Sequence, residues 1–495
     1  MKVLMAASEI FPLAKTGGLA DAVGAMARAL AALGAEVHLV MPAYRAVLEK
    51  AAGLAETGME VEIPLGERKV RGVILRAEIG GKIPTYLVRC DSYFLRPGLY
   101  GDQKGDYPDN AERFAFFCKA ALQVAKRWAP WEAIHCHDWQ AGLIPVLKKA
   151  RGKDYPELRG AKDILTIHNM AHQGIFPPSI WELLELDREY FTPRHLEFYG
   201  QVNILKGAIL FADAVTTVSN KYAAEIKTPE YGCGLDGVMR DREKDLRGIL
   251  NGVDYQEWDP ATDRHVKKNY RPKNLAGKAL CKKDLQQISG LPVKKSVPLI
   301  GVVSRLADQK GLDILAEILD DLMRYDLQIV VLGAGDEKYQ TLMAGLPARY
   351  PGKVAVTIGF DNALAHKIEA GADMFLMPSK FEPCGLNQMY SLKYGTIPVV
   401  RATGGLDDTI EDYDPLAGSG NGFKFSGYSG AMLLEVVKRA LTLYVNKGAW
   451  RRLMASAMAC DFSWEKSARS YLALYQKLAE RDRITARPSA APAAG

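Results

Sequence analysis

The sequence predicts an α/β protein built from two doubly wound domains, each with a parallel sheet covered by helices. Three observations support this prediction. The chain has 495 residues, more than a single core accommodates, since cores stop growing near ~250–300 residues. Short apolar runs alternate with amphipathic ones in the order strand, loop, helix, strand, which is typical of parallel α/β sheets. The pattern stops near residue 255 and starts again at residue 298.

The N-terminal domain is expected to span residues 1–255. It opens with an apolar strand at 2–8, a glycine-containing loop and an alanine-rich helix at 19–33, which together form the first unit of a parallel sheet. The further elements predicted in this domain are strands at 36–41, 133–137, 164–167 and 214–218 and a helix at 141–149.

The C-terminal domain is expected to span residues 298–483, after a linker at 256–297 that is rich in Lys, Asp, Asn and Pro. Its last helix is predicted at about 464–480, and the low-complexity tail at 484–495 is predicted to be disordered. The strands predicted in this domain lie at 298–303, 328–332, 354–357, 374–377 and 397–400.

Composition excludes several classes of function. The net charge is only +6, from 64 basic and 58 acidic residues without a dense basic run, which argues against a nucleic-acid partner. Neither a signal peptide nor a run of ~18 apolar residues is present, so no membrane span is expected. The seven cysteines are scattered without a Cys-x-x-Cys pair, which indicates free thiols and a cytoplasmic protein.

A glycine-containing loop, Lys15-Thr-Gly-Gly-Leu19, follows the first predicted strand. Ligands of open α/β sheets bind at the carboxyl ends of strands. Gly17 and Gly18 would let the backbone approach a phosphate at a helix N-terminus, and Lys15 adds a cation. The alternative is an ordinary tight turn with a surface lysine. A similar Thr-Gly-Gly-Leu at 403–406 suggests that both halves present a helix N-terminus in this way.

Two cations, Arg305 and Lys310, follow the first strand of the second domain. Arginine contacts an anion through two parallel hydrogen bonds and lysine acts as a point charge, so the pair suits a diphosphate leaving group. No Asp-x-Asp metal motif is evident, so these two cations are candidates for the charge that a metal would otherwise supply, and we expect no metal. The alternative is a solvated surface pair.

A third candidate is the acid Glu382, in the loop between a predicted strand and a helix. Its carboxylate would face the carboxyl edge of the sheet, and Gly385, Leu386 and Asn387 would offer amides to phosphate near the helix N-terminus. Cys384 is interpreted as a packing residue that contributes its backbone here, not as a nucleophile. The alternative is that Glu382 is only a charge at the start of the helix.

Histidines form the fourth candidate group. His135 and His137 share one face of a strand, but no third and fourth ligand has suitable spacing for a metal. Asp138 and Trp139 follow that strand and suit hydroxyl binding and stacking on a sugar ring. His168 ends the next strand and is either a hydrogen-bond partner of a sugar or a satisfied core residue.

A dinucleotide-binding fingerprint is only partly present. Leu332-Gly-Ala-Gly-Asp336 contains Gly-x-Gly, but Lys338 stands where the third glycine belongs. The sequence therefore disfavours a nicotinamide enzyme.

Together these segments resemble the glycogen and starch synthases that use ADP-glucose, a branch (family 5) of the retaining GT-B glycosyltransferases. The resemblance runs from residue 1 to about 480. The segments that carry it, in the family's order, are 15–19, 137–139, 168–169, 251–254, 304–305, 310–311, 381–386 and 393–396.

The resemblance implies a GT-B fold, in which two Rossmann-like domains face each other across a deep cleft and the last helix crosses back to the first domain. The first domain would hold the glucan acceptor and the second the nucleotide sugar. The implied reaction transfers glucose from ADP-glucose to the non-reducing end of glycogen or a malto-oligosaccharide, with retention of configuration. The resemblance implies neither a cofactor nor a metal.

The resemblance also implies roles for single residues. Lys15, Gly17 and Gly18 would approach the donor's phosphates and sugar, with Asp21 close behind them. Arg305 and Lys310 would hold the diphosphate and stabilise its departing charge.

Other implied roles concern the sugar. His168 would contact the 6-hydroxyl of glucose, and Glu382 would orient glucose and offset the charge of an oxocarbenium-like transition state. Asp138 and Asn251 would line the sugar and acceptor site. Phe360, where relatives often have Tyr, would stack on the adenine.

The sequence departs from the wider GT-B pattern at Tyr390, where many retaining enzymes carry a second Glu. Two alternatives to the synthase remain: another GT-B glucosyltransferase that uses sucrose or a small acceptor, and a catalytically silent glucan-binding protein. The second is disfavoured because the charged residues of the site are all present. The residues alone do not decide between ADP-glucose and UDP-glucose.

Overall fold

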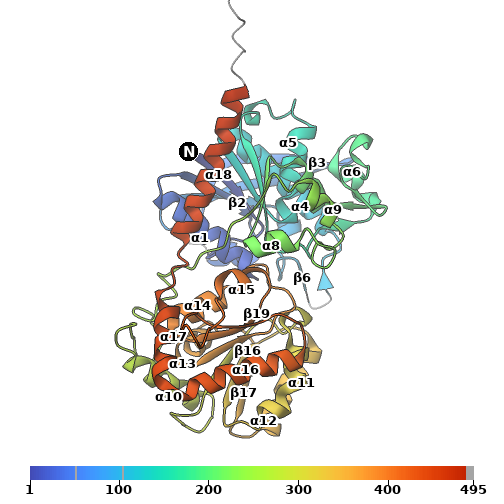
Figure 1. The fold of residues 1–495 in the computed structure, drawn as a ribbon. Coiled ribbons are helices and arrows are strands. Elements are labelled where there is room, and N and C mark those ends of the chain that lie inside the picture. The colour runs from blue at the N-terminus through green and yellow to red at the C-terminus, as the bar shows by residue number, and fades with distance from the viewer. Residues whose placement is uncertain (51–52, 103–104, 486–495) are drawn as a thin grey trace, which may run out of the picture. The chain divides into compact units, whose positions relative to one another are not determined.

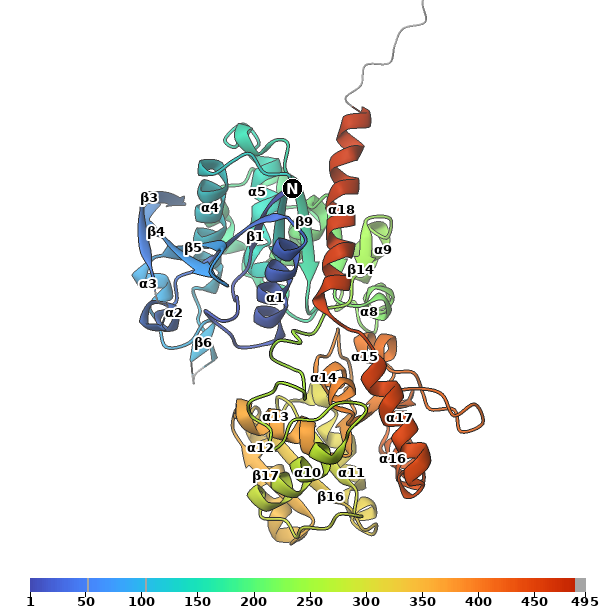
Figure 2. The same ribbon diagram turned by 90° about the vertical axis from the view of Figure 1, so that its left-hand side faces the viewer.

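The computed structural model describes residues 1–50, 53–102 and 105–485 (Figures 1 and 2). The chain divides into two compact units. The N-terminal unit contains Met1–Val218, Ala223–Gly252 and the segment from Trp464 onward, and the C-terminal unit contains Ser219–Tyr222 and Val253–Ser463. The last helix, α18 (Trp464–Thr485), therefore belongs to the N-terminal unit. Residues 486–495 of the predicted tail lie outside the described residues.

A nine-stranded sheet forms the centre of the N-terminal unit, in the order β14-β13-β9-β8-β1-β2-β5-β4-β3. The parallel strands are β1 (Lys2–Ala6), β2 (Glu36–Pro42), β5 (Ile83–Arg89), β8 (Ala133–His137), β9 (Lys162–Ile167), β13 (Ala214–Thr217) and β14 (Leu246–Gly248). The predicted strands of this half are all present. The long antiparallel strands β3 (Ala55–Leu65) and β4 (Arg68–Ile79) were not predicted, although their alternation of exposed and buried residues is typical of strands.

Helices of the N-terminal unit form two groups. The alanine-rich α1 (Gly18–Ala32) packs beside α18, while α5 (Leu143–Ala150) lies against α4 (Asn110–Arg127) and α7 (Ile204–Phe211) (Figure 2). The shorter elements are α2 (Arg45–Lys50), α3 (Asp91–Phe94), α6 (Trp181–Leu184), α9 (Asp236–Asp241), a small sheet of β10 (Ile175–Phe176), β11 (Glu197–Phe198) and β12 (Gln201–Asn203), and the strands β6 (Gly101–Asp102) and β7 (Gly105–Asp106). The boundary between the units divides α8 (Asn220–Glu225).

A six-stranded, fully parallel sheet forms the centre of the C-terminal unit, in the order β17-β16-β15-β18-β19-β20. Its apolar strands are buried by helices, as expected for a parallel sheet. The strands are β15 (Leu299–Val303), β16 (Gln328–Gly333), β17 (Val354–Ile358), β18 (Met374–Met377), β19 (Ile397–Arg401) and β20 (Phe423–Phe425). The helices are α10 (Ala276–Ile288), α11 (Leu312–Leu322), α12 (Glu337–Arg349), α13 (Asn362–Gly371), α14 (Asn387–Tyr394), α15 (Gly404–Thr409), α16 (Gly430–Val445) and α17 (Lys447–Ala459).

The structure corrects the predicted linker at 256–297, because this range contains α10, which packs against α13. Two of its lysines are buried together with their ammonium groups, which are bonded inside the C-terminal unit. Lys278 Nζ donates to Thr396 Oγ1 at 2.6 Å, and Lys282 Nζ lies 2.6 Å from a carboxylate oxygen of Asp373. A lysine-rich composition was therefore misread as a polar connection, although it belongs to a helix of the C-terminal unit.

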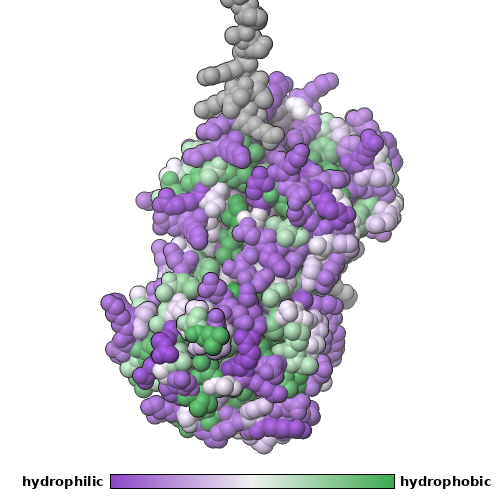
Figure 3. Space-filling model, viewed as in Figure 1, coloured by the Kyte–Doolittle hydropathy of each residue, from purple (hydrophilic) through white to green (hydrophobic). Residues whose placement is uncertain are grey.

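Among the parallel strands of each unit the strand order reverses between β1 and β8 in the N-terminal sheet and between β15 and β18 in the C-terminal sheet. Ligands of open α/β sheets bind beyond the carboxyl ends of the strands at such a point. The four candidate groups follow β1, β8, β15 and β18. In the part of the chain that the structure describes, no helix has the length and apolar character needed to cross a bilayer. Hydrophilic residues cover most of the face shown in Figure 3.

Candidate active site

A buried carboxylate organises the loop after β1. Glu9 is 3% exposed. It accepts hydrogen bonds from the backbone N–H of Thr16, from Thr16 Oγ1 at 2.6 Å and from Gly17 N at 3.3 Å. Tyr100 Oη donates to the same carboxylate at 2.6 Å and lies 2.7 Å from Ser8 Oγ. Glu9 therefore fixes the loop that begins α1, and the amide of Gly17 is already bonded within the protein.

Residues 15–18, which include Lys15 and the two glycines, are exposed. Lys15 Nζ lies 2.8 Å from Asp21 Oδ2, so the predicted cation and the predicted acid form an ion pair. Gly17 is the N-cap of α1, and a Cβ there would meet nothing within 4 Å. No packing inside the protein requires this glycine, which agrees with a surface kept open for a ligand.

Three histidines lie in a row at the carboxyl ends of β8 and β9. The imidazole centroids of His135 and His137 are 4.3 Å apart, and His137 Nδ1 lies 3.1 Å from His168 Nε2. His135 is held by Tyr475 Oη of α18 at 2.7 Å and by Thr166 Oγ1 at 2.6 Å. Burial lowers the pKa of His135 and of His168 to about 3, so the row is uncharged near neutral pH.

Asp138 sits at the turn that follows β8, with a left-handed backbone (φ 56°). Such angles are uncommon for non-glycine residues and cluster at functional sites. Its Oδ1 accepts the backbone N–H of His168 at 2.7 Å, and the side chain is buried. Burial raises the pKa of Asp138 to about 7, while the backbone N–H groups of His168 and Asn169 oppose that rise. The carboxyl group therefore fixes the position of His168.

The structure contradicts the prediction that Trp139 stacks on a sugar. Its side chain is buried, and its ring makes edge contacts with Phe114 at 5.1 Å and Phe176 at 5.4 Å between centroids. Gly174 packs so closely on the ring that a Cβ there would lie 2.5 Å from it. The position after β8 suggested an exposed aromatic, but the 3₁₀ turn Trp139–Ala141 directs the ring into the core.

Asn251 lies after β14 and is 4% exposed. Its Oδ1 has no hydrogen-bond partner among the described residues. A buried amide oxygen without a partner is costly, so it is a position where a ligand hydroxyl would be stabilised.

In the C-terminal unit, Lys310 and Glu382 form an ion pair, with Nζ and Oε2 2.6 Å apart. Glu382 is 6% exposed and also accepts from Ser379 Oγ at 3.0 Å. Arg305 is exposed, and among the described residues its Nη2 reaches Gln309 Oε1 alone, at 3.4 Å. The structure thus brings the predicted acid and one predicted cation together, and it leaves the guanidinium of Arg305 open to an anion.

Close backbone contacts hold these loops beside each other. Gly311 has φ +68°, and a Cβ there would lie 2.0 Å from the carbonyl oxygen of Pro378. A Cβ at Gly404 would lie 2.0 Å from the carbonyl oxygen of Glu382, and one at Gly405 would lie 2.0 Å from that of Cys384. The second Thr-Gly-Gly sequence is therefore a packing element, unlike the open loop at Gly17.

The residues after Glu382 lead into α14. Cys384 is buried as expected of a packing residue, and Gly385 has φ +70°. Leu386 is the N-cap of α14. The side chain of Asn387 donates to the carbonyl of Val303 at 2.8 Å, which ties α14 to the end of β15. Asn387 therefore shapes the site through its side chain, a contact that the sequence did not predict.

Tyr390 stands where other retaining enzymes carry a second Glu, and its ring stacks on Trp258 at 4.0 Å between centroids and 2° between planes. The ring of Trp258 also stacks on His366, with 3.7 Å between the ring centroids and 7° between the planes. This position is therefore filled by aromatic packing, and no second carboxylate is available there.

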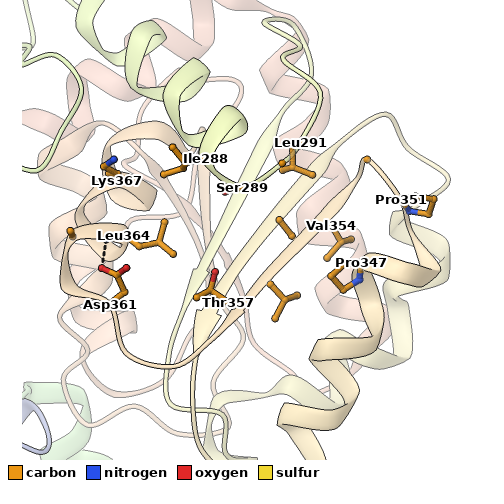
Figure 4. Close-up of a pocket in the computed structure, with 15 residues that line it drawn as sticks. Ile288, Ser289, Leu291, Pro347, Pro351, Val354, Thr357, Asp361, Leu364 and Lys367 are labelled. Atoms are coloured by element: carbon orange, nitrogen blue, oxygen red, sulfur yellow. Dashed lines mark hydrogen bonds between the residues drawn. The ribbon is translucent and has the colours of Figure 1, made fainter.

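Phe360, which follows β17, is 83% exposed and free to stack on a base. A cavity of about 720 Å³ borders β17, between the end of α10 and α12 (Figure 4). Its rim includes Asp361, which accepts the N–H of Leu364 at 2.9 Å as the N-cap of α13. None of the predicted site residues lines this cavity, so it is distinct from the candidate site.

Among the described residues, no group of three or more His, Cys, Asp and Glu side chains is placed to hold a metal ion. The sequence does contain one Asp-x-Asp, at Asp412 and Asp414. Asp412 accepts the N–H of Lys424 at 2.8 Å and pairs with Arg439, while Asp414 accepts the N–H of Leu416 at 2.8 Å. These carboxylates cap turns and bind a guanidinium.

Comparisons with known proteins identify the family. A family model described as the starch synthase catalytic domain matches residues 2–241, and one described as glycosyl transferases group 1 matches residues 284–450. A glycogen synthase of Koribacter versatilis is 50% identical over 477 residues, which cover 96% of this chain and 98% of the relative. The chain belongs to the glycogen synthase family. It is therefore a glycosyltransferase.

Further members of the glycogen synthase family are equally similar over the whole length. The glycogen synthase of Moorella thermoacetica is 50% identical over 489 residues, 98% of each chain. The solved catalytic domain of starch synthase IV from Arabidopsis thaliana, bound to ADP and acarbose, is 32% identical with a TM-score of 0.89 and covers 97% of this chain and 99% of that one. The fold is GT-B. A sucrose-phosphate synthase from Thermosynechococcus elongatus shares the fold alone (TM-score 0.61, 16% identity).

Sequence reasoning missed the residues that position the predicted site of this family member. Glu9 holds the loop of Lys15, Ser379 holds Glu382, and Arg401 donates to the carbonyl of Lys380 at 2.5 Å. Glu9 could have been noticed from the sequence, because it interrupts the apolar run that follows the first strand. Nothing local in the sequence marks Arg401, because its partner Lys380 lies in another loop, whereas Ser379 stands only three residues before its partner Glu382.

Proposed function

We propose that the chain transfers glucose from ADP-glucose to the 4-hydroxyl at the non-reducing end of an α-1,4-glucan, with retention of configuration. Two findings support the substrates. The relatives that match over the full length are named glycogen synthases. The starch synthase IV domain that matches the whole chain was solved with ADP and acarbose.

The observation that carries the proposal is the grouping of Arg305, Lys310 and Glu382 at the switch point of the C-terminal sheet. A diphosphate leaves with developing negative charge, which two cations can stabilise. The ammonium of Lys310 has three donors, so it can bind a phosphate oxygen while it remains paired with Glu382. Arg305, whose side chain is exposed, supplies the second cation.

The chemistry then needs little covalent help from the protein. The bond between C1 of glucose and the diphosphate oxygen breaks, and a bond from the acceptor's O4 to C1 forms on the same face. The proton of the 4-hydroxyl passes to the departing phosphate oxygen, and ADP leaves. Positioning and charge stabilisation supply the rate enhancement. Glu382 offsets the positive charge that develops on the sugar.

We assign the N-terminal residues to the sugar and the acceptor. His168 is uncharged and held in place by Asp138, which suits a hydrogen bond to a glucose hydroxyl. Asn251 offers its unpartnered oxygen to a hydroxyl, and Lys15 offers its ammonium to a phosphate. In the C-terminal unit, Phe360 offers its exposed ring to the adenine.

We further propose that the reaction needs no metal, since the two cations occupy the role that a metal would fill. Turnover should persist in excess chelator. All seven cysteines are free thiols, which fits the reducing cytoplasm.

The test removes the cations one at a time. Arg305→Ala and Lys310→Ala should each lower kcat by about 10²-fold or more, as for other groups that stabilise developing charge. Lys338→Ala is the matched control, because Lys338 is a surface lysine paired with Asp308 and should leave kcat unchanged. Near-normal turnover of Arg305→Ala would remove the basis of the proposed mechanism.

A further inference from the structure

The histidine row contains a feature that the proposed mechanism does not use. His137 is fully buried, its Nδ1 lies 3.1 Å from His168 Nε2, and its Nε2 has no partner among the described residues. His168 is only partly buried. Burial lowers the pKa of His137 well below its usual range, and both rings are therefore neutral near pH 7.

Two neutral imidazoles joined by one hydrogen bond share a single proton between the facing nitrogens, so two arrangements exist. In the first, His137 Nδ1–H donates to His168 Nε2, and His137 Nε2 is a bare acceptor. In the second, His168 Nε2–H donates, and His137 must carry its own proton on Nε2. That proton would be a buried donor without an acceptor.

Buried donors without an acceptor are rarer in proteins than under-used acceptors. The first arrangement is therefore favoured. We infer that His137 is a positioning residue that keeps His168 in the tautomer with its proton on Nδ1. His168 then meets the substrate as a hydrogen-bond donor and not as a base. This inference rests on the proposed function, in which His168 contacts a hydroxyl of the transferred glucose.

The surroundings keep His137 in this orientation. The ring of His135 packs against it, and His135 is in turn fixed by Tyr475 of α18 and by Thr166 of β9. The hydrogen bond that one imidazole nitrogen makes sets the protonation of the other, so a rigid His137 determines which nitrogen of His168 carries the proton.

The direct test is the tautomer itself. In the full-length protein labelled with ¹⁵N-histidine, long-range ¹H–¹⁵N correlations separate Nδ1–H from Nε2–H rings, and His137→Asn and His168→Gln assign the signals. We expect the proton on Nδ1 in both His137 and His168. A proton on Nε2 of His168 would overturn the inference. This readout does not depend on turnover, so it stands even if the proposed donor or acceptor is wrong.

Variants test the consequence. His137→Asn retains an N–H near the position of Nδ1 and should keep kcat/KM within about threefold, whereas His137→Leu should lower it by about tenfold or more, the range for one lost hydrogen bond. Thr85→Val is the matched control, since it removes a buried hydrogen bond of the N-terminal unit from β5, a strand that pairs with β2 and β4 and not with the strands of the histidine row. Equal losses in Thr85→Val and His137→Leu, or no loss in His137→Leu, would show that His137 serves packing alone. If His137→Leu does not fold, the tautomer of the unmodified protein decides.

Discussion

Asp138 combines burial, a left-handed backbone and a raised pKa in one residue. Each of these features costs stability, and a protein retains such a residue where function needs it. The carboxylate accepts the backbone N–H of His168, so this destabilising residue fixes a residue of the candidate site.

The charge of Asp138 should make folding less favourable as the pH rises. Because its folded pKa of about 7 lies above the unfolded value near 3.9, stability is lost between those two pH values and stays low above pH 7. Asp138→Asn keeps an acceptor and tolerates the positive φ. It should therefore be more stable than the unmodified protein by an amount that grows by about 1 kcal/mol or more from pH 5 to pH 7.

Thermal unfolding of both proteins across this pH range measures the effect. A stability difference that is constant with pH would show that Asp138 does not titrate as described.

Two glycines of similar sequence context have opposite structural roles. Gly405→Ala would place a Cβ 2.0 Å from the carbonyl oxygen of Cys384, whereas Gly17→Ala meets nothing within 4 Å. Gly405→Ala should cost about 1–3 kcal/mol of stability, as overpacking typically does. Gly17→Ala should unfold like the unmodified protein and raise the KM for the nucleotide sugar. The reverse pattern in thermal unfolding and kinetics would contradict the assignment of the loops.

Single residues also show what chain order can predict. Arg305, Lys310 and Glu382 were predicted to lie in loops that follow strands of the second domain, and the structure places them after β15 and β18. Trp139 was misjudged because the same rule places a residue at the sheet edge without saying whether its side chain turns inward. Glu9 was passed over because its role depends on Thr16 and Tyr100, a contact that only the folded chain makes.

At the scale of elements, the parallel strands were predictable because buried parallel strands are short apolar runs. The helix α10 and the antiparallel strands β3 and β4 were missed, because lysines and glutamates conceal their apolar faces. Amphipathic side chains with buried stems make a structured segment resemble a linker in composition.

The helix α18 should contribute to the N-terminal unit in a measurable way. Tyr471 and Tyr475 are at most 1% exposed and contact His135. Tyr475→Ala should cost about 3–5 kcal/mol, the range for a deleted buried aromatic side chain. Arg469 lies on the exposed face of the same helix and pairs with Glu465, so Arg469→Ala should cost less than 1 kcal/mol. Similar unfolding temperatures for the two variants would indicate that α18 does not pack firmly in solution.

At the scale of the whole molecule, both units place charged or polar residues at the carboxyl ends of strands on either side of a reversal in strand order. The N-terminal unit contributes Asp138 bonded to the backbone of His168, and the C-terminal unit contributes the ion pair of Lys310 and Glu382. The proposed reaction therefore draws on residues of both units.

The most direct test of the account is turnover by the full chain with ADP-glucose or UDP-glucose, with and without glycogen, in the presence of chelator. The account predicts ADP release that depends on glycogen, together with new α-1,4 linkages of retained configuration. Release from UDP-glucose alone would contradict the proposed donor, and glucan binding without release from either nucleotide sugar would contradict the proposed transferase reaction.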